Sequence, residues 1–423
     1  MRWPKKIVAI FGLILMSIPA SAAGPEASIR PSVRSATAAL AGTSVQGVAS
    51  QGFDDWIVDF RPRAIAAGVA PDTFDQAMKG LKYDAKIIKR DRNQAEFTKT
   101  IWDYLDTAAS DLRVQNGRKA LLKWDVPLSK IEAEYGVKKQ VIVAIWGLES
   151  AYGTFRGSVA IINALATLAY DARRAAFFEN ELLEALLILQ NGDTTRALMQ
   201  GSWAGAMGHT QFMPSSFQAY AVDFDGDGKR NIWEDDPRDA LASTAAYLKH
   251  FGWTHGQPWG IEVRLPDDFD FELAARKTLK HPTEWAALGL TPVAGRFEDE
   301  HGPASILLPG GGEGAAFMIF ANFAVIEKYN TADAYVIGVG HLSDRISGGG
   351  AIEQKWPRRL RALSKEERIE LQERLTTAGF DTVKIDAKMG PLTINAVRRF
   401  QKSIGQRPDG YPSLAILDRL RAR

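Results

Sequence analysis

The 423-residue chain contains no cysteine. This absence excludes disulfides, Cys-ligated zinc, iron–sulfur clusters, a thiol nucleophile and a lipidated N-terminal cysteine. An excess of charge of one sign is missing too, because 52 Lys and Arg and 50 Asp and Glu leave a formal charge of only +2. The total charge therefore indicates no particular partner, and we expect no nucleic acid among the partners.

Long apolar runs are scarce, and the one at the N-terminus is short. Residues 1–22 begin with positive charges, continue with an apolar run from Ile7 to Ile18 and end in small residues, which is the pattern of a signal peptide. A membrane anchor would need about 20 apolar residues. We expect cleavage after Ala22 and a soluble periplasmic protein that inserts into no membrane and, without cysteine, is not a lipoprotein.

Composition and periodicity divide the rest of the chain. Residues 23–52 are rich in Ala, Ser, Gly and Thr and predict a flexible lead-in. In residues 53–346, apolar positions recur mostly at helical spacing, as in 128–152, with strand-like pieces between about 253 and 327. Gly-rich residues 347–363 predict a linker. The expected fold class is α+β, mainly helical, with a small β-containing insertion.

Residues 364–423 are expected to form a compact unit of their own. Ser364 and Glu367 have the spacing of a capping box that opens a helix. Two further apolar stripes follow, and Ser413 opens the last of them. The pattern predicts a domain of three helices.

Glu149 is a single carboxylate near the end of an otherwise apolar helical stretch, 141–153. At helical spacing it shares a face with Ile142, Ile145 and Trp146. Burial there would raise the pKa of Glu149 and make it a proton donor near neutral pH. The alternative is a glutamate that reaches solvent at the helix end, since Gly153 follows closely. The pattern alone does not decide between the two.

The stretch 201–216 combines Gly and Ala with Trp, Met and Phe. Such a composition suits a backbone that passes close to a ligand, or tight packing between helices. Four motifs follow one another along the chain: GLESAYG, the 201–216 stretch, DFDGDGKRNIW and residues 322–330. In this order they resemble the lytic murein transglycosylases of the B type over roughly 53–345. Residues 365–423 resemble the small peptidoglycan-binding module of wall enzymes.

The resemblance implies a lysozyme-like catalytic domain that cleaves the β-1,4 bond between N-acetylmuramic acid and N-acetylglucosamine without water. Ordinary glycosidases use two carboxylates. Here the motif supplies only Glu149, which would protonate the leaving oxygen and then, as carboxylate, accept the proton of the muramic acid 6-hydroxyl. The product would be a 1,6-anhydro end, and the chemistry would need no cofactor.

The resemblance also places further residues at the substrate. It implies that Ser202, Gln211 and Tyr329 lie beside the acid as hydrogen-bonding groups, and that Tyr247 and Tyr335 stack on sugar faces with their hydroxyls paired. Arg173 and Arg174 match a basic pair for the carboxylates of the stem peptides, although two such arginines also suit a solvated helix face. For His209 and Thr210 we have no firm expectation.

An acidic loop lies at 223–234. It has the spacing of an EF-hand loop, with Arg230 at a position that is usually aliphatic, so a structural calcium ion and a self-closed Asp/Gly turn both remain open. The expected ligands are Asp223, Asp225, Asp227, Lys229 through its carbonyl, and either Glu234 or Asp239 to close the loop.

Three other functions compete with this prediction: a hydrolytic muramidase, a non-catalytic peptidoglycan-binding scaffold and a calcium-regulated adhesion protein. The expected partners are glycan strands, stem peptides and possible other wall enzymes. Residues 355–423 contain 16 Lys and Arg and 8 Asp and Glu, a net charge of +8. A basic tail suits a module that docks on carboxylate-bearing peptidoglycan.

Overall fold

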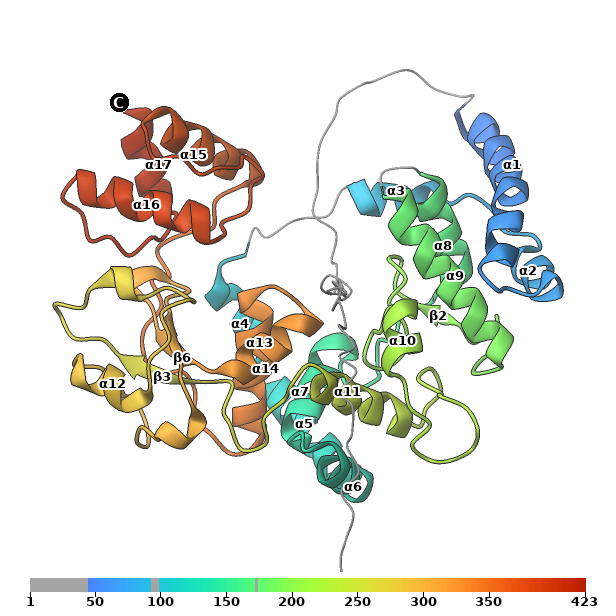
Figure 1. Ribbon diagram of the computed structural model, residues 1–423, viewed down its shortest axis with the longest axis horizontal. Helices are drawn as coiled ribbons and strands as arrows, with labels where there is room; N and C mark the ends of the chain where they lie inside the picture. Colours follow the sequence, from blue (N-terminus) through green and yellow to red (C-terminus); the bar gives the residue numbers. More distant parts are fainter. Residues whose placement is uncertain (1–44, 93–98, 172–173) are drawn as a thin grey trace, which may run out of the picture.

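The computed structural model describes residues 45–92, 99–171 and 174–423, with the backbone alone for 45–51 (Figure 1). The expected signal peptide and most of the expected lead-in lie outside these residues. Helix α1 begins at Val45, so residues 45–52 belong to a helix and not to a flexible lead-in. No helix within the described ranges is long and apolar enough to cross a membrane.

The described residues up to Glu149 are mostly helical. The helices are α1 (Val45–Ala66), α2 (Pro71–Met78), α3 (Ala85–Arg92), α4 (Ile101–Ala108), α5 (Asp111–Lys123), α6 (Asp125–Tyr135) and α7 (Lys139–Ser150). The expected helical stretch 128–152 is two helices, because Gly136 adopts φ +72° and ends α6. Helix α7 is almost wholly buried and packs against α5, α11 and α14.

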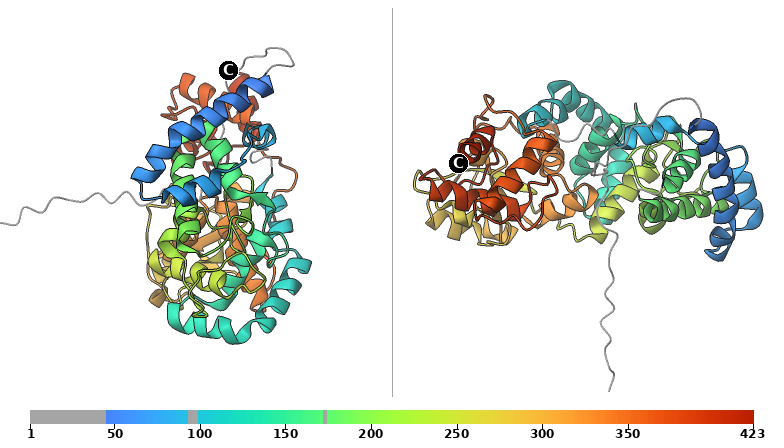
Figure 2. Two further views of the ribbon diagram at one scale, coloured as in Figure 1. Left: turned by 90° about the vertical axis from the view of Figure 1, so that its right-hand side faces the viewer. Right: turned by 90° about the horizontal axis from the view of Figure 1, so that it is seen from above.

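Helices from later parts of the chain form a second group, in which α11 and α14 pack against α7. The group consists of α8 (Ile161–Tyr170), α9 (Ala175–Asn191), α10 (Pro214–Tyr220), α11 (Arg238–His250), α13 (Ala321–Tyr329) and α14 (Asp333–Ile346). Strands β1 (Val159–Ala160) and β2 (Gln200–Gly201) pair as an antiparallel ribbon just before the 201–216 stretch. The two further views show that the described part of the chain forms one elongated body (Figure 2).

The β-containing insertion is a four-stranded antiparallel sheet in the order β4-β3-β6-β5. Its elements are β3 (Gly260–Arg264), α12 (Pro282–Ala287), β4 (Thr291–Pro292), β5 (Ser305–Leu307) and β6 (Ala316–Ile319). The Gly-rich segment 310–314 connects the antiparallel strands β5 and β6. Its separate core contains Val263, Trp285 and Met318, all fully buried.

The three predicted C-terminal helices are present as α15 (Lys365–Thr377), α16 (Pro391–Ser403) and α17 (Leu414–Arg421). Ser364 and Glu367 form the expected capping box, and the Ser413 hydroxyl caps α17. Leu371, Val397 and Leu417 meet in their shared core.

The C-terminal domain does not hang free from the rest of the chain but rests on the β insertion (Figure 1). Arg398 donates to the carbonyl of Ala274 at 2.6 Å, and Asp409 accepts the N–H of Gly312 at 2.9 Å. The expected linker is also packed, since Gln354 donates to the carbonyl of Val263 on β3. Arg398, one of the positive charges of this domain, thus contacts the β insertion.

Val383 lies in the C-terminal domain with φ +66°, although a β-branched residue rarely adopts this conformation. Its side chain is exposed, so it contributes little packing. We expect Val383→Gly to raise the free energy of unfolding of the full chain by about 0.5–1 kcal/mol in urea denaturation. Ile385→Gly, a nearby exposed position without positive φ, is the control and should destabilise. Equal losses for both variants would contradict the prediction.

Candidate active site

Glu149 lies in the last turn of α7, half-buried. The helix ends immediately after it, because Ala151, Tyr152 and Gly153 all adopt positive φ. Two non-glycine residues in this conformation indicate a constrained turn, and such turns occur often at functional sites. The Tyr152 hydroxyl donates to the carbonyl of Arg113 at 2.7 Å and holds the turn in place. Glu149 is therefore held at a constrained helix end. It is neither fully buried nor fully exposed, so its environment lies between the buried and the solvent-exposed glutamate that the sequence left open.

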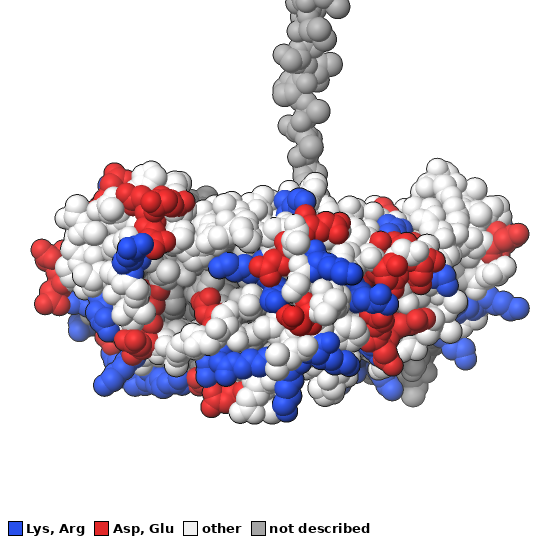
Figure 3. All heavy atoms as spheres, turned by 90° about the horizontal axis from the view of Figure 1, so that it is seen from below, with Lys and Arg blue, Asp and Glu red and all other residues white. Residues whose placement is uncertain are grey.

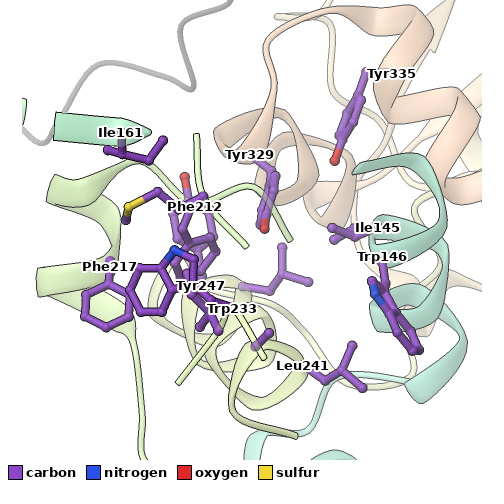
Figure 4. Close-up of a cluster of buried hydrophobic side chains, with 14 of the residues drawn as sticks. Ile145, Trp146, Ile161, Phe212, Phe217, Trp233, Leu241, Tyr247, Tyr329 and Tyr335 are labelled. Carbon is purple, nitrogen blue, oxygen red and sulfur yellow. The ribbon is translucent and has the colours of Figure 1, made fainter. Parts of the chain in front are cut away.

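The Tyr335 hydroxyl donates a hydrogen bond of 2.6 Å to Glu149 Oε1. Tyr335 comes from α14 and is only 2% exposed. Burial, and next the charge of Glu149, raise the pKa of Tyr335 well above its ordinary value, so the hydroxyl keeps its proton. Figure 4 shows Tyr335 on the far side of Tyr329 from Phe212, facing the helix that carries Ile145 and Trp146.

Tyr329 and Tyr247 hold backbone groups near the acid. Tyr329 donates to the carbonyl of Thr210 at 2.6 Å, and Tyr247 donates to the carbonyl of Lys328 at 2.6 Å. The pKa of Tyr329 is raised well above its usual value by burial, with a further contribution from the nearby charge of Glu149. The expected role of Tyr329 as a hydrogen-bonding group for the sugar stays a prediction, since its hydroxyl is paired with the carbonyl of Thr210.

The expected stacking of Tyr247 and Tyr335 on sugar faces is wrong. Both rings are buried, and Tyr247 is in contact with the rings of Phe212, Tyr329 and Phe251. A stacking platform needs an open face, which these rings lack. Their hydroxyls are paired as expected, so both tyrosines act through the groups that they hold.

The 201–216 stretch is a compact loop braced by its own side chains. Ser202 Oγ accepts the N–H of Ala206 at 3.0 Å. Gln211, with φ +57°, donates its amide to the carbonyls of Gly208 and Arg156 at 2.8 and 3.0 Å. Both residues are half-buried. Within the described residues, Gln211 Oε1 accepts no hydrogen bond, which leaves it open to a ligand.

His209 is the residue of this site that sequence reasoning missed. Its Nδ1 lies 3.1 Å from Trp146 Nε1, its Nε2 lies 2.6 Å from the carbonyl oxygen of Glu234, and its own carbonyl accepts from Ser150 Oγ at 2.5 Å. Burial lowers the pKa of His209 to about 4. The only signal in the sequence is a lone histidine among small residues.

The structure places Arg174 differently from the expected peptide-binding pair. Its guanidinium lies 3.6 Å from the buried carboxylate of Asp91 and over the ring of Phe178. The arginine thus packs between α3 and α9 and does not project as a solvated group. Arg173 lies outside the described residues.

The acidic loop brings together Asp223, Asp225 and Asp227, whose nearest ligand oxygens all lie within 4.8 Å of one another. The side chain of Glu234 is exposed and does not join this cluster. Asp239, on α11, is 3% exposed and accepts backbone N–H groups of the loop, for example that of Phe224 at 2.9 Å. Asp239 therefore braces the loop.

The contacts of Arg230 account for an arginine at a position that is usually aliphatic in EF-hand loops. Its guanidinium makes two hydrogen bonds to the carboxylate of Asp193, at 3.1 and 2.7 Å, and lies over the ring of Phe217. An ion pair and a cation–π contact replace the usual aliphatic anchor. The loop is thus fastened to Asp193 after α9 and to Phe217 on α10.

Two family models match the chain. The model described as Transglycosylase SLT domain covers residues 52–344, and the one described as Putative peptidoglycan binding domain covers residues 364–420. The chain belongs to the SLT transglycosylase family. The resemblance stated from the motifs is therefore confirmed, as is the expected fold class of a mainly helical, lysozyme-like domain followed by a peptidoglycan-binding domain.

Several characterised proteins are similar to the chain. The membrane-bound lytic murein transglycosylase B of Escherichia coli K12 is 36% identical over 241 residues, which cover 55% of this chain and 64% of that protein. The chain thus matches less than two thirds of the length of this curated relative.

Solved structures cover more of the chain. SltB3 of Pseudomonas aeruginosa, in complex with NAG-anhNAM-pentapeptide, is 47% identical with a TM-score of 0.85 and covers 88% of this chain and 100% of its own. A second SltB3 structure contains NAG-NAM-pentapeptide. Slt35 of Escherichia coli, in complex with calcium, is 30% identical with a TM-score of 0.58 over 70% of this chain and 93% of its own.

Proposed function

We propose that the protein is a peptidoglycan lytic transglycosylase that cleaves the β-1,4 bond between N-acetylmuramic acid and N-acetylglucosamine and forms 1,6-anhydromuramic acid ends. The observation that carries the proposal is the hydrogen bond from Tyr335 to Glu149 at the end of α7, in a chain of the SLT family. The function serves turnover and remodelling of the cell wall.

Glu149 acts first as an acid. In its acid form the carboxyl group of Glu149 carries a proton, while its Oε1 accepts the hydrogen bond of the Tyr335 hydroxyl. This proton passes to the glycosidic oxygen, and the bond between that oxygen and C1 of muramic acid breaks with its electron pair going to the oxygen. The substrate's own N-acetyl oxygen meets the charge that develops at C1.

The same carboxylate then acts as a base. It accepts the proton of the muramic acid 6-hydroxyl while that oxygen forms the new bond to C1, so Glu149 regains its proton and no water is consumed. Tyr335 stabilises the intervening carboxylate by a charge-assisted hydrogen bond. The amide oxygen of Gln211 and the hydroxyl of Ser202 are the groups of the 201–216 loop that we expect to hold the sugar.

Product analysis tests this function. Digestion of purified sacculi by the full chain is expected to release muropeptides that end in 1,6-anhydromuramic acid. Reducing muramic acid ends would instead indicate a hydrolytic muramidase. Binding to sacculi with no soluble product would indicate a non-catalytic scaffold.

The C-terminal domain is proposed to anchor the enzyme on peptidoglycan. Residues 355–423 carry a net charge of +8, whereas Lys and Arg are interspersed with Asp and Glu on the face of the molecule in Figure 3. Binding to sacculi is expected to weaken as salt is added, because exposed charges are screened. Export by residues 1–22 to the periplasm, without a lipid anchor, is part of the same proposal.

We also propose that the acidic loop binds a structural calcium ion. Carboxylate oxygens are the donors that calcium prefers, and those of Asp223, Asp225 and Asp227 converge. The carbonyl of Lys229 would complete the set, and Asp239 would support it from behind. The ion would stabilise the loop and take no part in the chemistry.

Calcium is expected to raise the melting temperature of the full chain, because a ligand that binds only the folded state stabilises it. At about 100 times the dissociation constant the gain is about 2.7 kcal/mol. Asp225→Asn should abolish the shift, whereas Glu234→Gln should leave it unchanged because the exposed Glu234 side chain is not part of the cluster. An unchanged melting temperature at millimolar calcium would contradict the proposal.

A further inference from the structure

The helix that carries the acid is tied to the acidic-loop segment through one imidazole. Trp146 stands one helical turn before Glu149, and its indole N–H can only donate, so His209 Nδ1 is the acceptor at 3.1 Å. In the neutral ring, Nε2 then carries the proton and donates to the carbonyl of Glu234 at 2.6 Å. Nδ1 thus has Trp146 as its partner, whereas Nε2 lies close to the Glu234 carbonyl and also 3.1 Å from Arg156 Nη1.

The backbone of His209 makes two further ties. Its N–H donates to the carbonyl of Ile232 at 3.0 Å, and its carbonyl accepts from Ser150 Oγ, which is the residue after the acid, at 2.5 Å. The same Ser150 oxygen accepts the N–H of Gly153 at 3.0 Å. The turn that ends α7 is therefore held from the 201–216 loop at several points around His209.

Space around the ring is closed. A Cβ atom at Gly153 would lie 2.6 Å from the imidazole, and His209 itself is 2% exposed. The Trp146 and His209 rings meet edge to face with centroids 5.7 Å apart. Such a fitted contact between two elements permits little freedom to the helix end that they share.

We propose that His209 is a positioning residue for the reaction, which fixes the end of α7, and with it Glu149, against the loop that holds Gln211. The inference rests on the proposed function. His209 does not reach the substrate in this role but acts through Trp146 and Ser150. The Trp146 contact is the one that matters for the acid, whereas the Glu234 contact holds the acidic-loop segment.

Two substitutions separate these contacts. Asn places its side-chain oxygen where Nδ1 stands, so His209→Asn retains an acceptor for Trp146 and loses the contact with Glu234. Gln reaches the position of Nε2, so His209→Gln retains the donor to Glu234 and leaves Trp146 Nε1 without its acceptor. Both replace the ring by an amide, and each is therefore the control for the other.

The test combines kinetics on sacculi with the indole N–H spectrum of the ¹⁵N-labelled full chain. For His209→Gln, kcat is expected to fall about 10-fold or more with KM little changed, because a small displacement of the acid affects the chemical step. The Trp146 cross-peak, assigned with Trp146→Phe, should shift and exchange faster. For His209→Asn, most of the kcat and a protected Trp146 indole should remain.

The outcomes separate the inference from the function on which it rests. If the wild-type chain releases no anhydro product, the proposed function fails and the inference fails with it. If the wild type is active but His209→Gln keeps its kcat, or both variants lose kcat equally with an undisturbed Trp146 signal, only the positioning role is overturned.

Discussion

A Glu149→Gln chain is expected to release anhydro-muropeptides from sacculi about 10²- to 10⁴-fold more slowly than the wild type. Glutamine can neither give a proton to the glycosidic oxygen nor accept one from the 6-hydroxyl, so both halves of the mechanism are lost together. Its amide oxygen still accepts the hydrogen bond from Tyr335. The fold around α7 should therefore persist, and binding to sacculi should remain.

Glu184→Gln is the matched control for this prediction. Glu184 is also a half-buried glutamate, on α9, and burial raises its pKa. Its substitution is expected to leave the rate unchanged. A Glu149→Gln chain that kept more than a few per cent of the wild-type rate would remove Glu149 from its catalytic role.

Gly157→Ala is expected to have the largest effect on stability. Gly157 has φ +88°, and a Cβ atom there would lie 2.1 Å from the carbonyl oxygen of Gly201. The contact joins the turn after α7 to the start of the 201–216 loop, so neither backbone can move without disturbing the site. We expect a loss of about 3 kcal/mol or more in the free energy of unfolding, because a positive-φ penalty and a backbone clash add.

Gly192→Ala separates these two causes. Gly192 has φ +78° at the end of α9, but no atom lies within 4 Å of its missing Cβ. This control should cost about 1–2 kcal/mol, the penalty of the left-handed conformation alone. Equal losses in urea denaturation for the two variants would show that the approach to Gly201 contributes nothing. Only Gly157→Ala should also reduce activity.

The C-terminal domain shows which local features a sequence specifies well. The capping box of Ser364 and Glu367 and the cap at Ser413 are contacts between residues three positions apart, so their spacing is visible in the chain itself. The break between α6 and α7 was missed because the apolar periodicity continues across Gly136, and only the positive φ of that residue ends the helix.

The tyrosines show the opposite case. The motifs placed Tyr247, Tyr329 and Tyr335 near the acid, but whether a ring faces a sugar or the core depends on what packs against it. That packing comes from α11, α13 and α14, which are distant in the sequence from α7. The Arg174 side chain was misjudged for the same reason, since its partner Asp91 lies on α3.

The sequence by itself determined the α+β class, the C-terminal helices and the family, because helix caps, apolar periodicity and ordered motifs are properties of short stretches. It also singled out Glu149 as the one carboxylate of its motif. Only the tertiary structure decided that Tyr335 donates to Oε1 of Glu149 and that His209 joins the acidic-loop segment to α7. The contacts of Tyr335 with Glu149 and of His209 with Ser150 connect residues 186 and 59 positions apart, and no local pattern records which side chains meet across such separations.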